Sequence, residues 1–427
     1  MTDRGRRPAT TRHAPEKQMS RPSATSDRIY VVGAGPVGAV MTLALARRGI
    51  PVTLVESNPG PVDDQRAATV HPPTIEMLEA LGIEKDGWET GLKSPLFHFW
   101  DRVTGERIAE FDLGLLKDEV RYPFCLQWEQ YKLARSALAH LPTDGSAEVL
   151  FSHTLTGLEQ TADGVTLTTE VDGESRTLQG AYVIGTDGGR STVRKLAGIA
   201  FEGFTWEERF LKIGTTFDFL GTSAGFCTRN YFSDPDEWLN LFKVKGPGEP
   251  GIWRGIFPVP ADEPDEVALS DERIQQRFQK FFPRAGRYDI AYTGLYKVHQ
   301  RVADTFNRGR VLLAGDSAHV NNPIGGMGMN GGIHDAMNLA DKLAAIRFDG
   351  ASPDVLDRYT RQRRKAQVDF VQAQTIRNKK SLEESDPVRR RQNLDEMRRT
   401  CEDIALHKAF LMRGALFDSL KSANAVQ

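Results

Sequence analysis

The stretch DRIYVVGAGPVGAVMTLALARRGIPVTLVES, residues 27–57, has the order expected of a strand, a tight turn, a helix and a second strand. The apolar runs 29–32 and 52–55 predict two buried parallel strands. Three glycines with the spacing of a dinucleotide-binding fingerprint lie between them: Gly33, Gly35 and Gly38. In such a fingerprint the first glycine makes the turn, the second leaves room for a pyrophosphate, and the third allows close packing of the helix. The whole order predicts a Rossmann-like domain.

The ends of these elements carry the binding chemistry. The helix N-terminus would present unpaired N–H groups to a phosphate. Glu56 ends the second strand, where a carboxylate can accept hydrogen bonds from ribose hydroxyls, and an acid here favours FAD or NAD over NADP. The residues expected to hold the dinucleotide are Gly33, Gly35, Pro36, Val37, Gly38 and Glu56.

A second glycine-rich stretch, RVLLAGDSAHVNNPIGGMGMNGG, covers residues 310–332. It repeats the fingerprint spacing, but no strand leads directly into these glycines and none is expected after the helix that follows. We therefore do not expect a second Rossmann unit. A buried strand should end at Gly315 and Asp316, where an acid can meet a ribityl or ribose hydroxyl. The glycine loop would place free N–H groups at a helix start, which stabilises the negative charge of a reduced flavin.

The bulk composition excludes several classes of protein. The chain has 427 residues and a formal net charge of −2, which gives no reason to expect nucleic acid as a partner. Its three cysteines lie far apart, so we expect neither a disulfide framework nor a metal site. We expect a cytoplasmic location for the same reason. No apolar run is long enough to span a membrane. Residues 1–27 are polar and are expected to form a disordered leader, and Met1 and Met19 both remain candidate starts.

The middle and the end of the chain differ from the first part. Short aromatic and β-branched runs between residues 201 and 299 predict a mostly antiparallel sheet that could roof a pocket. The candidate pocket residues of this sheet are Arg229, Tyr231, Trp238, Trp253 and Arg254. For each of them a place on the sheet surface or in the core is an equal alternative. Residues 351–427 predict charge-rich helices that are either solvated or in contact with a second subunit of a homodimer.

Several single residues invite an overinterpretation. His319 follows the buried strand of the second stretch, so packing or hydrogen bonding is favoured over a role as general base. His299 is expected to be a surface or structural residue. Met327 and Met329 are expected to pack rather than to undergo redox chemistry.

Three motifs together carry a resemblance: the fingerprint at 33–38, GTDGGRSTVR at 185–194 and GDSAHVNNPIGGMGMNGG at 315–332. The chain resembles, from about residue 28 to 347, the single-component FAD-dependent aromatic hydroxylases, the p-hydroxybenzoate hydroxylase-like class A flavoprotein monooxygenases. The resemblance implies an α/β and α+β fold. It would have a Rossmann-like FAD-binding domain (28–200 and 300–350), an inserted β-sheet substrate domain (201–299 with part of 95–120) and a C-terminal helical segment (351–427).

The resemblance also implies roles for individual residues. Arg66 would lie near the cofactor, Gln130 near the flavin ribityl chain, and Asp316 on that chain. Asp187 and Gly188 would serve both FAD and NAD(P)H. The residues implied to line the flavin ring are Pro323, Gly325, Gly326, Met327, Gly328, Met329 and Asn330. Two features depart from many relatives: the asparagines at 321 and 322, and a charged helical tail where larger relatives carry a thioredoxin-like domain.

The activity implied by the resemblance is a monooxygenase reaction on a phenolic or other electron-rich aromatic ring. NADPH or NADH would reduce FAD, and O₂ would give a flavin C4a-hydroperoxide that hydroxylates the substrate. An oxygenase or epoxidase acting on a polycyclic natural product is an alternative, as is a flavin-binding scaffold without turnover. A flavin halogenase is disfavoured because IWRGIFP, residues 252–258, lacks the Trp-x-Trp-x-x-Pro pattern. The sequence names no catalytic base.

Overall fold

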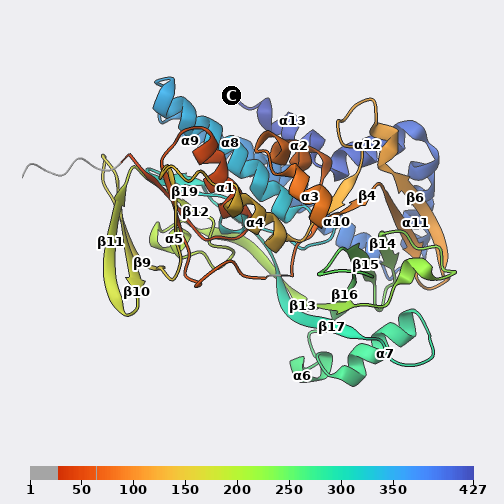
Figure 1. Cartoon of the computed structure of the whole chain (residues 1–427). Coiled ribbons are helices and arrows are strands. Elements are labelled where there is room, and N and C mark those ends of the chain that lie inside the picture. Colours follow the sequence, from red (N-terminus) through yellow and green to blue (C-terminus); the bar gives the residue numbers. More distant parts are fainter. Residues whose placement is uncertain (1–26, 64) are drawn as a thin grey trace, which may run out of the picture.

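A computed structural model describes residues 27–63 and 65–427 of the chain. The expected leader, apart from Asp27, and the choice between Met1 and Met19 lie outside the described residues. Figure 1 shows the order of the elements along the chain. Within the described ranges, no helix is long and apolar enough to cross a membrane.

The first part of the fold is a six-stranded sheet whose order is β18-β19-β12-β1-β2-β8. These strands are β18 (Asn307–Arg308), β19 (Val311–Leu313), β12 (Tyr182–Gly185), β1 (Ile29–Val32), β2 (Val52–Val55) and β8 (Ala147–Leu150). All except β18 are parallel. The central strands are buried throughout and, apart from Thr53, mostly apolar, as is typical of parallel sheets. The runs predicted at 29–32 and 52–55 agree with β1 and β2 residue for residue.

Helices and smaller sheets surround these strands. The helix α1 (Pro36–Arg47) packs on both α8 (Gly328–Phe348) and α4 (Gln130–Ala139). Beside the parallel sheet stand the antiparallel strands β9 (Thr154–Gln160), β10 (Val165–Val171) and β11 (Glu174–Gly180). The remaining elements on this side are α2 (Pro72–Ala80), α3 (Glu84–Thr90), α5 (Thr192–Leu196), and the small sheet of β3 (Thr69–Val70), β7 (Cys125–Gln127) and β4 (Leu92–Ser94).

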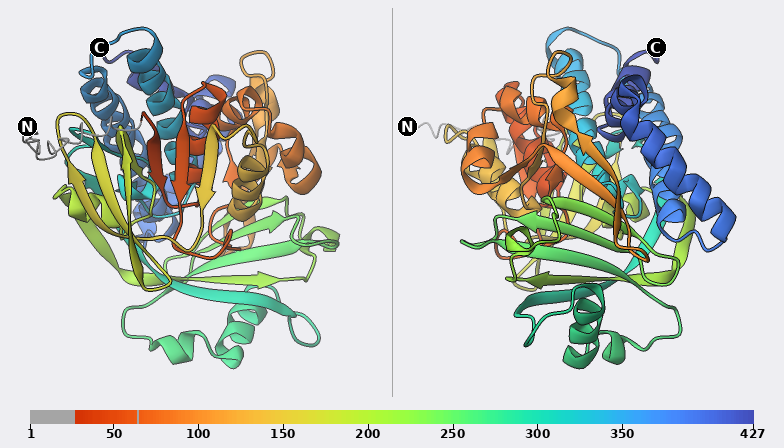
Figure 2. Two further views of the ribbon diagram at one scale, coloured as in Figure 1. Left: turned by 60° about the vertical axis from the view of Figure 1, so that its left-hand side comes forward. Right: turned by 90° about the vertical axis from the view of Figure 1, so that its right-hand side faces the viewer.

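The second part is an eight-stranded sheet of order β20-β17-β13-β16-β15-β14-β5-β6, in which only β14 and β5 pair in parallel. Its strands are β20 (His319–Val320), β17 (Ile290–Ala303), β13 (Phe201–Thr215), β16 (Ile252–Val259), β15 (Leu239–Val244), β14 (Arg229–Ser233), β5 (Leu96–Asp101) and β6 (Glu106–Asp112). Figure 2 shows this sheet as a layer beside the parallel sheet, with α6 (Asp265–Ala268) and α7 (Asp271–Phe281) on its far side. The predicted antiparallel sheet is therefore present.

Both faces of this sheet are apolar, because successive side chains of a strand point to opposite faces. Phe210 and Tyr231 belong to a cluster on the face toward the C-terminal helices, whereas their neighbours Leu211 and Phe232 belong to a cluster under α7. Since β17 continues from residue 290 to 303, it crosses the predicted domain limit at 299, and the domain limits stay a prediction.

The chain ends in a series of helices that lies along one side of the molecule (Figure 2). These are α9 (Val355–Lys365), the π-helical turn η4 (Ala366–Gln372), α10 (Ala373–Leu382), α11 (Pro387–Glu402), α12 (Ile404–Gly414) and α13 (Phe417–Asn424). Asp386 caps α11 by accepting from Arg389 N, and Asp403 caps α12 by accepting from Ala405 N. The α11 helix packs against β6, so this segment is a wall of the sheet rather than a free tail.

Candidate active site

Four motif residues meet because the strands that carry them are parallel neighbours. Gly33 follows β1, Glu56 follows β2, Asp187 follows β12 and Asp316 follows β19. Carboxyl ends of parallel strands share one edge of a sheet, where α/β proteins bind their ligands. The Thr186 hydroxyl donates to Gly33 O at 3.0 Å and so joins the first and second motifs.

The glycine turn leaves space for a diphosphate. Gly33 has a φ of +104°, and a Cβ on Gly38 would lie 1.8 Å from Gly33 O, so both positions exclude a larger residue. Around Gly35, by contrast, a Cβ would meet no atom within 4 Å. Gly35 caps α1 without a side-chain hydrogen bond, which leaves the first N–H groups of the helix to a ligand. These residues fit the diphosphate of FAD.

Neighbouring side chains hold the turn in place. Glu56 Oε2 accepts from Ala34 N at 2.7 Å, and its Oε1 accepts from Asn58 N at 2.9 Å. Pro36 occupies the first turn of α1, where its missing N–H costs nothing. The Val37 side chain packs so tightly against both Gly315 and Gly332 that a Cβ on either would lie within 3.0 Å of it. Val37 thus connects the first motif to the third.

Asp187 has a structural task of its own. Its carboxylate accepts from Ser191 Oγ at 2.5 Å and from Thr192 N at 2.6 Å, which caps the start of α5. Burial raises the pKa of this carboxyl group, although these hydrogen bonds lower it in part. Gly188 has a φ of +80° and no atom within 4 Å of a built Cβ, so its backbone is open to a ligand.

The loop that carries Arg66 pairs through Ala67 with Gln130, 63 residues further along the chain. Gln130 N donates to Ala67 O at 2.9 Å, and Gln130 Oε1 accepts from Ala67 N at 3.3 Å. Arg66 is exposed and lies close to Tyr296: burial raises the pKa of this tyrosine, and the charge of Arg66 lowers it in part. The loop that carries Arg66 is therefore fixed at the start of α4.

A buried charge network under Asp316 escaped the sequence analysis. Asp335 on α8 accepts from Gly315 N at 3.0 Å, contacts His319 Nε2 at 2.6 Å and accepts from Arg363 Nε at 2.6 Å. Burial raises the pKa of Asp335, but His319 and Arg363 outweigh that effect, so the pKa is lowered. His319 is fully buried and pairs with a carboxylate, in agreement with the hydrogen-bonding role expected for it. The network fixes the turn that carries the exposed Asp316.

The glycine loop before α8 is held from inside by Asn330. Its Nδ2 donates to Gly326 O at 2.6 Å and to Thr69 O at 2.8 Å, and its Oδ1 accepts from His71 N at 2.8 Å. Asn330 and Met329 are buried, so neither side chain lies on an open surface. Met327 packs against Val371 and Leu416, as expected of a packing residue. In the loop Pro323 is exposed, and Gly325, Gly326 and Gly328 are half-buried.

His71 is a site residue that the sequence analysis missed. Its Nε2 lies 2.9 Å from Gly325 O, which can only accept, so Nε2 carries the proton. Its Nδ1 lies 3.5 Å from Cys125 Sγ. Burial, and then the charge of Arg229, lower the pKa of His71 to about 3, so the ring is neutral.

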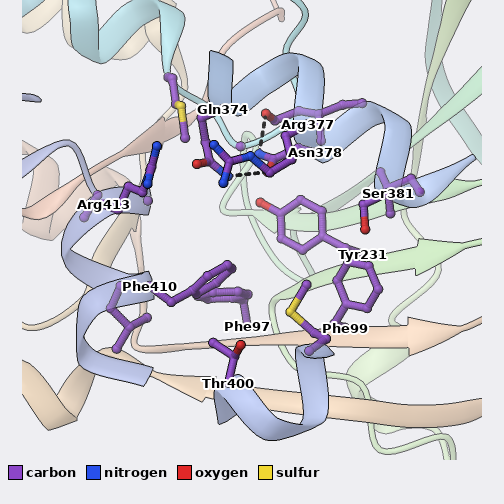
Figure 3. Close-up of a pocket in the computed structure, with 18 of the residues that line it drawn as sticks. Phe97, Phe99, Tyr231, Gln374, Arg377, Asn378, Ser381, Thr400, Phe410 and Arg413 are labelled. Carbon is purple, nitrogen blue, oxygen red and sulfur yellow. Dashed lines mark hydrogen bonds between the residues drawn. The ribbon is translucent and has the colours of Figure 1, made fainter. Parts of the chain in front are cut away.

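A cavity of about 440 Å³ opens between the sheet, the glycine loop and the C-terminal helices. Figure 3 shows Phe97 and Phe410 on one side of it and the Tyr231 hydroxyl pointing into it. Phe111 stacks on both phenylalanine rings, with centroids 4.9 Å from Phe97 and 4.5 Å from Phe410. Other lining residues are Phe99, Arg229, Ile324, Gly325, Met327, Arg377, Ser381, Thr400 and Arg413. The volume and aromatic lining are typical of a small-molecule site.

The structure separates the candidate pocket residues of the sheet. Arg229 and Tyr231 line the cavity. The prediction for Trp253 is wrong: its ring lies on the opposite face against Phe219, and its Nε1 donates to Asp218 at 2.9 Å.

Two further candidates have contacts of other kinds. Trp238 packs with its ring centroid 4.8 Å from that of Phe210. The Arg254 guanidinium donates to the Tyr292 hydroxyl and to Gln65 Oε1, next to the Arg66 loop. Neither side chain is among those that line the cavity.

The comparisons with known proteins agree with this geometry. The sequence model of the family "FAD binding domain" matches residues 27–374. Para-nitrophenol 4-monooxygenase of Pseudomonas sp. (strain WBC-3) is 33% identical over 395 residues, covering 91% of this chain and 95% of that protein. The 6-hydroxy-3-succinoylpyridine 3-monooxygenase of Pseudomonas putida (strain DSM 28022 / S16) is 32% identical over 361 residues, covering 84% of this chain and 90% of that protein. The crystal structure of p-nitrophenol 4-monooxygenase from Pseudomonas putida DLL-E4 superposes with a TM-score of 0.86, at 33% identity over 93% of this chain and 98% of that one.

The fold and the site thus define a flavoprotein, and the chain belongs to the family of FAD-dependent aromatic hydroxylases. It is an FAD-dependent monooxygenase, and the expected family, fold class and cofactor are confirmed. FAD supplies electron transfer and oxygen activation when bound, and O₂ is the second substrate.

Proposed function

We propose that the protein hydroxylates a phenolic ring held in the 440 Å³ cavity, with NAD(P)H as the electron donor. The observation that carries this proposal is the position of the cavity. One wall is the glycine loop at Gly325 and Met327, implied to line the flavin ring, and the opposite walls are aromatic. A ring bound there would lie next to the flavin. The names of the relatives agree, since two of them act on nitrophenol and pentachlorophenol.

We place FAD on the residues of the sheet edge. The diphosphate would contact the backbone of Gly33, Gly35, Pro36, Val37 and Gly38, and Glu56 would accept from a ribose. Arg66, Gln130 and Asp316 would meet the ribityl side, and the backbone around Gly325 would meet the ring. In the same proposal Asp187 caps α5 while the open backbone at Gly188 faces the cofactor.

The chain's own contribution is to orient the ring and to exclude water. Phe97, Phe99 and Phe410 form an apolar wall, so a phenol would displace water from the cavity. The helices α10, α11 and α12 close the cavity with Arg377, Thr400 and Phe410 (Figure 3), and α10 also contacts the loop, since Asn378 Nδ2 donates to Ile324 O at 3.2 Å. If water entered the site, the oxygen would be released as hydrogen peroxide instead of being transferred to the substrate.

The proposal also covers the domain limits, the cellular location and the oligomeric state. The FAD-binding domain would comprise 28–200 and 300–350, and the substrate domain 201–299 with part of 95–120. A cytoplasmic location agrees with three free cysteines. A homodimer could form through the outer face of the C-terminal helices, where Val388, Ile404 and Leu406 are exposed.

The test is anaerobic bleaching of the bound flavin by NADPH and by NADH, with and without a panel of phenols. We expect at least one phenol to accelerate bleaching strongly and to be hydroxylated when O₂ is admitted. Phe97→Leu should raise the KM for that phenol. Phe232→Leu, a buried phenylalanine on the other face of the same sheet, should leave KM unchanged and lower only stability. If no aromatic compound changes the rate of bleaching, the proposal fails.

A further inference from the structure

A buried arginine in the cavity wall forms no salt bridge within the described part of the chain. Arg229 on β14 is 4% exposed, and its Nε and Nη1 have no hydrogen-bond partner among the described residues. Its Nη2 makes one long hydrogen bond, 3.4 Å, to the Tyr231 hydroxyl. The guanidinium also lies 5.1 Å from the centroid of Phe97, which stabilises a cation but does not neutralise it.

The thiols and the imidazole next to Arg229 are neutral at pH 7, and neither Glu384 nor Glu396, the carboxylates that line the same cavity, forms a salt bridge with it. Burial raises the pKa of the Cys125 and Cys227 thiols, and it holds the pKa of His71 at about 3. Tyr231 contributes a hydroxyl group. Since an arginine does not lose its proton in proteins, the positive charge stays without compensation. A buried charge of this kind is costly unless a ligand brings the opposite charge.

We propose that Arg229 is the residue that binds the ionised hydroxyl group of the phenolic substrate, and that Tyr231 donates a second hydrogen bond to the same oxygen. This inference rests on the proposed function. Arg229 Nε and Nη1 remain to be satisfied, and both residues line the cavity. Because Tyr231 accepts from Arg229, its own O–H is left to donate, and it points into the cavity (Figure 3).

The assignment explains how the ring is activated without a dedicated base. The O–H bond of the phenol breaks in solution, its proton passes to bulk water, and the electron pair stays on the oxygen that then binds beside Arg229. An ionised oxygen raises the electron density at the ortho and para carbons, which favours transfer of an electrophilic oxygen atom. A phenolate and an aromatic carboxylate both carry an anionic oxygen that an arginine can bind. The experiment must therefore separate these two ligands.

The probe is 4-nitrophenol, whose absorption reports its ionisation, bound to the FAD-loaded enzyme without NAD(P)H between pH 5 and 8. We expect the pKa of the bound probe to lie at least about one unit below that of the free probe, a tenfold preference for the phenolate. Arg229→Met should abolish this shift and weaken phenolate binding by about tenfold or more. Arg229→Lys should keep part of it. Arg377→Met removes an exposed cation from the same cavity and should keep nearly all of it, because exposed charges are screened.

Each other outcome has a distinct meaning. An unshifted pKa in the wild type, or a shift that Arg229→Met retains, overturns the assignment and leaves phenol hydroxylation intact. Arg229→Met that loses FAD while the probe ionises normally would assign the residue to the cofactor instead. Binding of 4-nitrobenzoate as tight as that of 4-nitrophenolate would overturn the assignment to a phenolate. The proposed function itself is tested separately, and it fails if no aromatic compound changes the rate of flavin bleaching. Circular dichroism and FAD content show whether each variant is folded, and the wild-type shift alone suffices to refute the inference.

Discussion

Two alanine substitutions in the glycine turn should separate cofactor binding from folding. Gly35 has a φ of −63°, which suits any residue, and its built Cβ has no atom within 4 Å. Gly35→Ala should therefore change the stability of the apoprotein by less than about 0.5 kcal/mol. If the pyrophosphate passes over Gly35, the methyl group should weaken FAD binding by at least about tenfold, or ~1.4 kcal/mol.

Gly38→Ala is the matched control, because it should act in the opposite way. Its Cβ would lie 1.8 Å from Gly33 O and 2.6 Å from Thr186 Oγ1, so the backbone must move. Such overpacking costs ~1–3 kcal/mol, and the backbone contact places it at the upper end. Replacing a helical glycine by alanine returns about 1 kcal/mol, which leaves a net loss of about 2 kcal/mol.

The assay combines urea unfolding of the apoproteins with titration of FAD by flavin fluorescence. The structure predicts a stable Gly35→Ala protein with weak FAD binding, and a destabilised Gly38→Ala protein. Wild-type FAD affinity in Gly35→Ala would refute the path of the diphosphate over this residue. Wild-type stability in Gly38→Ala would refute the close packing of α1 on the turn.

Three more predictions follow from single contacts. The folded protein keeps His71 neutral with a pKa of about 3, whereas an unfolded histidine titrates near 6.5, so this stabilisation is complete above pH 6.5 and is lost as the pH falls toward 3. Between pH 7 and pH 5 the free energy of unfolding in urea should fall by up to about 2 kcal/mol more for the wild type than for His71→Gln. Equal losses in the two proteins would contradict the neutral state of His71. Arg363→Met should cost about 3–5 kcal/mol in urea unfolding, because it strips a partner from buried Asp335, whereas the exposed Arg361→Met should cost little; similar losses would refute the buried network. Trp253→Phe should lower stability by about 1 kcal/mol through its lost hydrogen bond to Asp218 and leave the KM for a phenol unchanged, and a raised KM would return this residue to the cavity.

Local sequence patterns predicted the sheet edge well. The apolar runs of β1 and β2 end where buried strands must end, and each is followed by a motif residue, Gly33 or Glu56. The buried run before Asp316 likewise indicated an acid at a strand end, whereas the role of Asp187 came only from the resemblance of GTDGGRSTVR to a family motif. The strand ends needed only neighbouring residues in the sequence.

Contacts between distant segments were beyond such reasoning. His71 contacts Gly325, which lies 254 residues further along the chain. Asp335 pairs with Arg363 only when α8 and α9 pack together, and nothing in the local sequence distinguishes this arginine from its exposed neighbours. Trp253 was misplaced because both faces of its sheet are apolar, so alternation does not say which face lines the cavity. The charges of α11 made the whole run appear solvated, although α12 is largely apolar and brings Phe410 to the cavity.

The most direct test of the account is the fate of molecular oxygen. The FAD-loaded enzyme should be supplied with NAD(P)H, ¹⁸O₂ and the phenol that accelerates flavin bleaching, and the product analysed by mass spectrometry. The account predicts one ¹⁸O atom in each molecule of hydroxylated product and the other in water. Unlabelled product, or consumption of NAD(P)H that yields only hydrogen peroxide with every phenol tested, would contradict it.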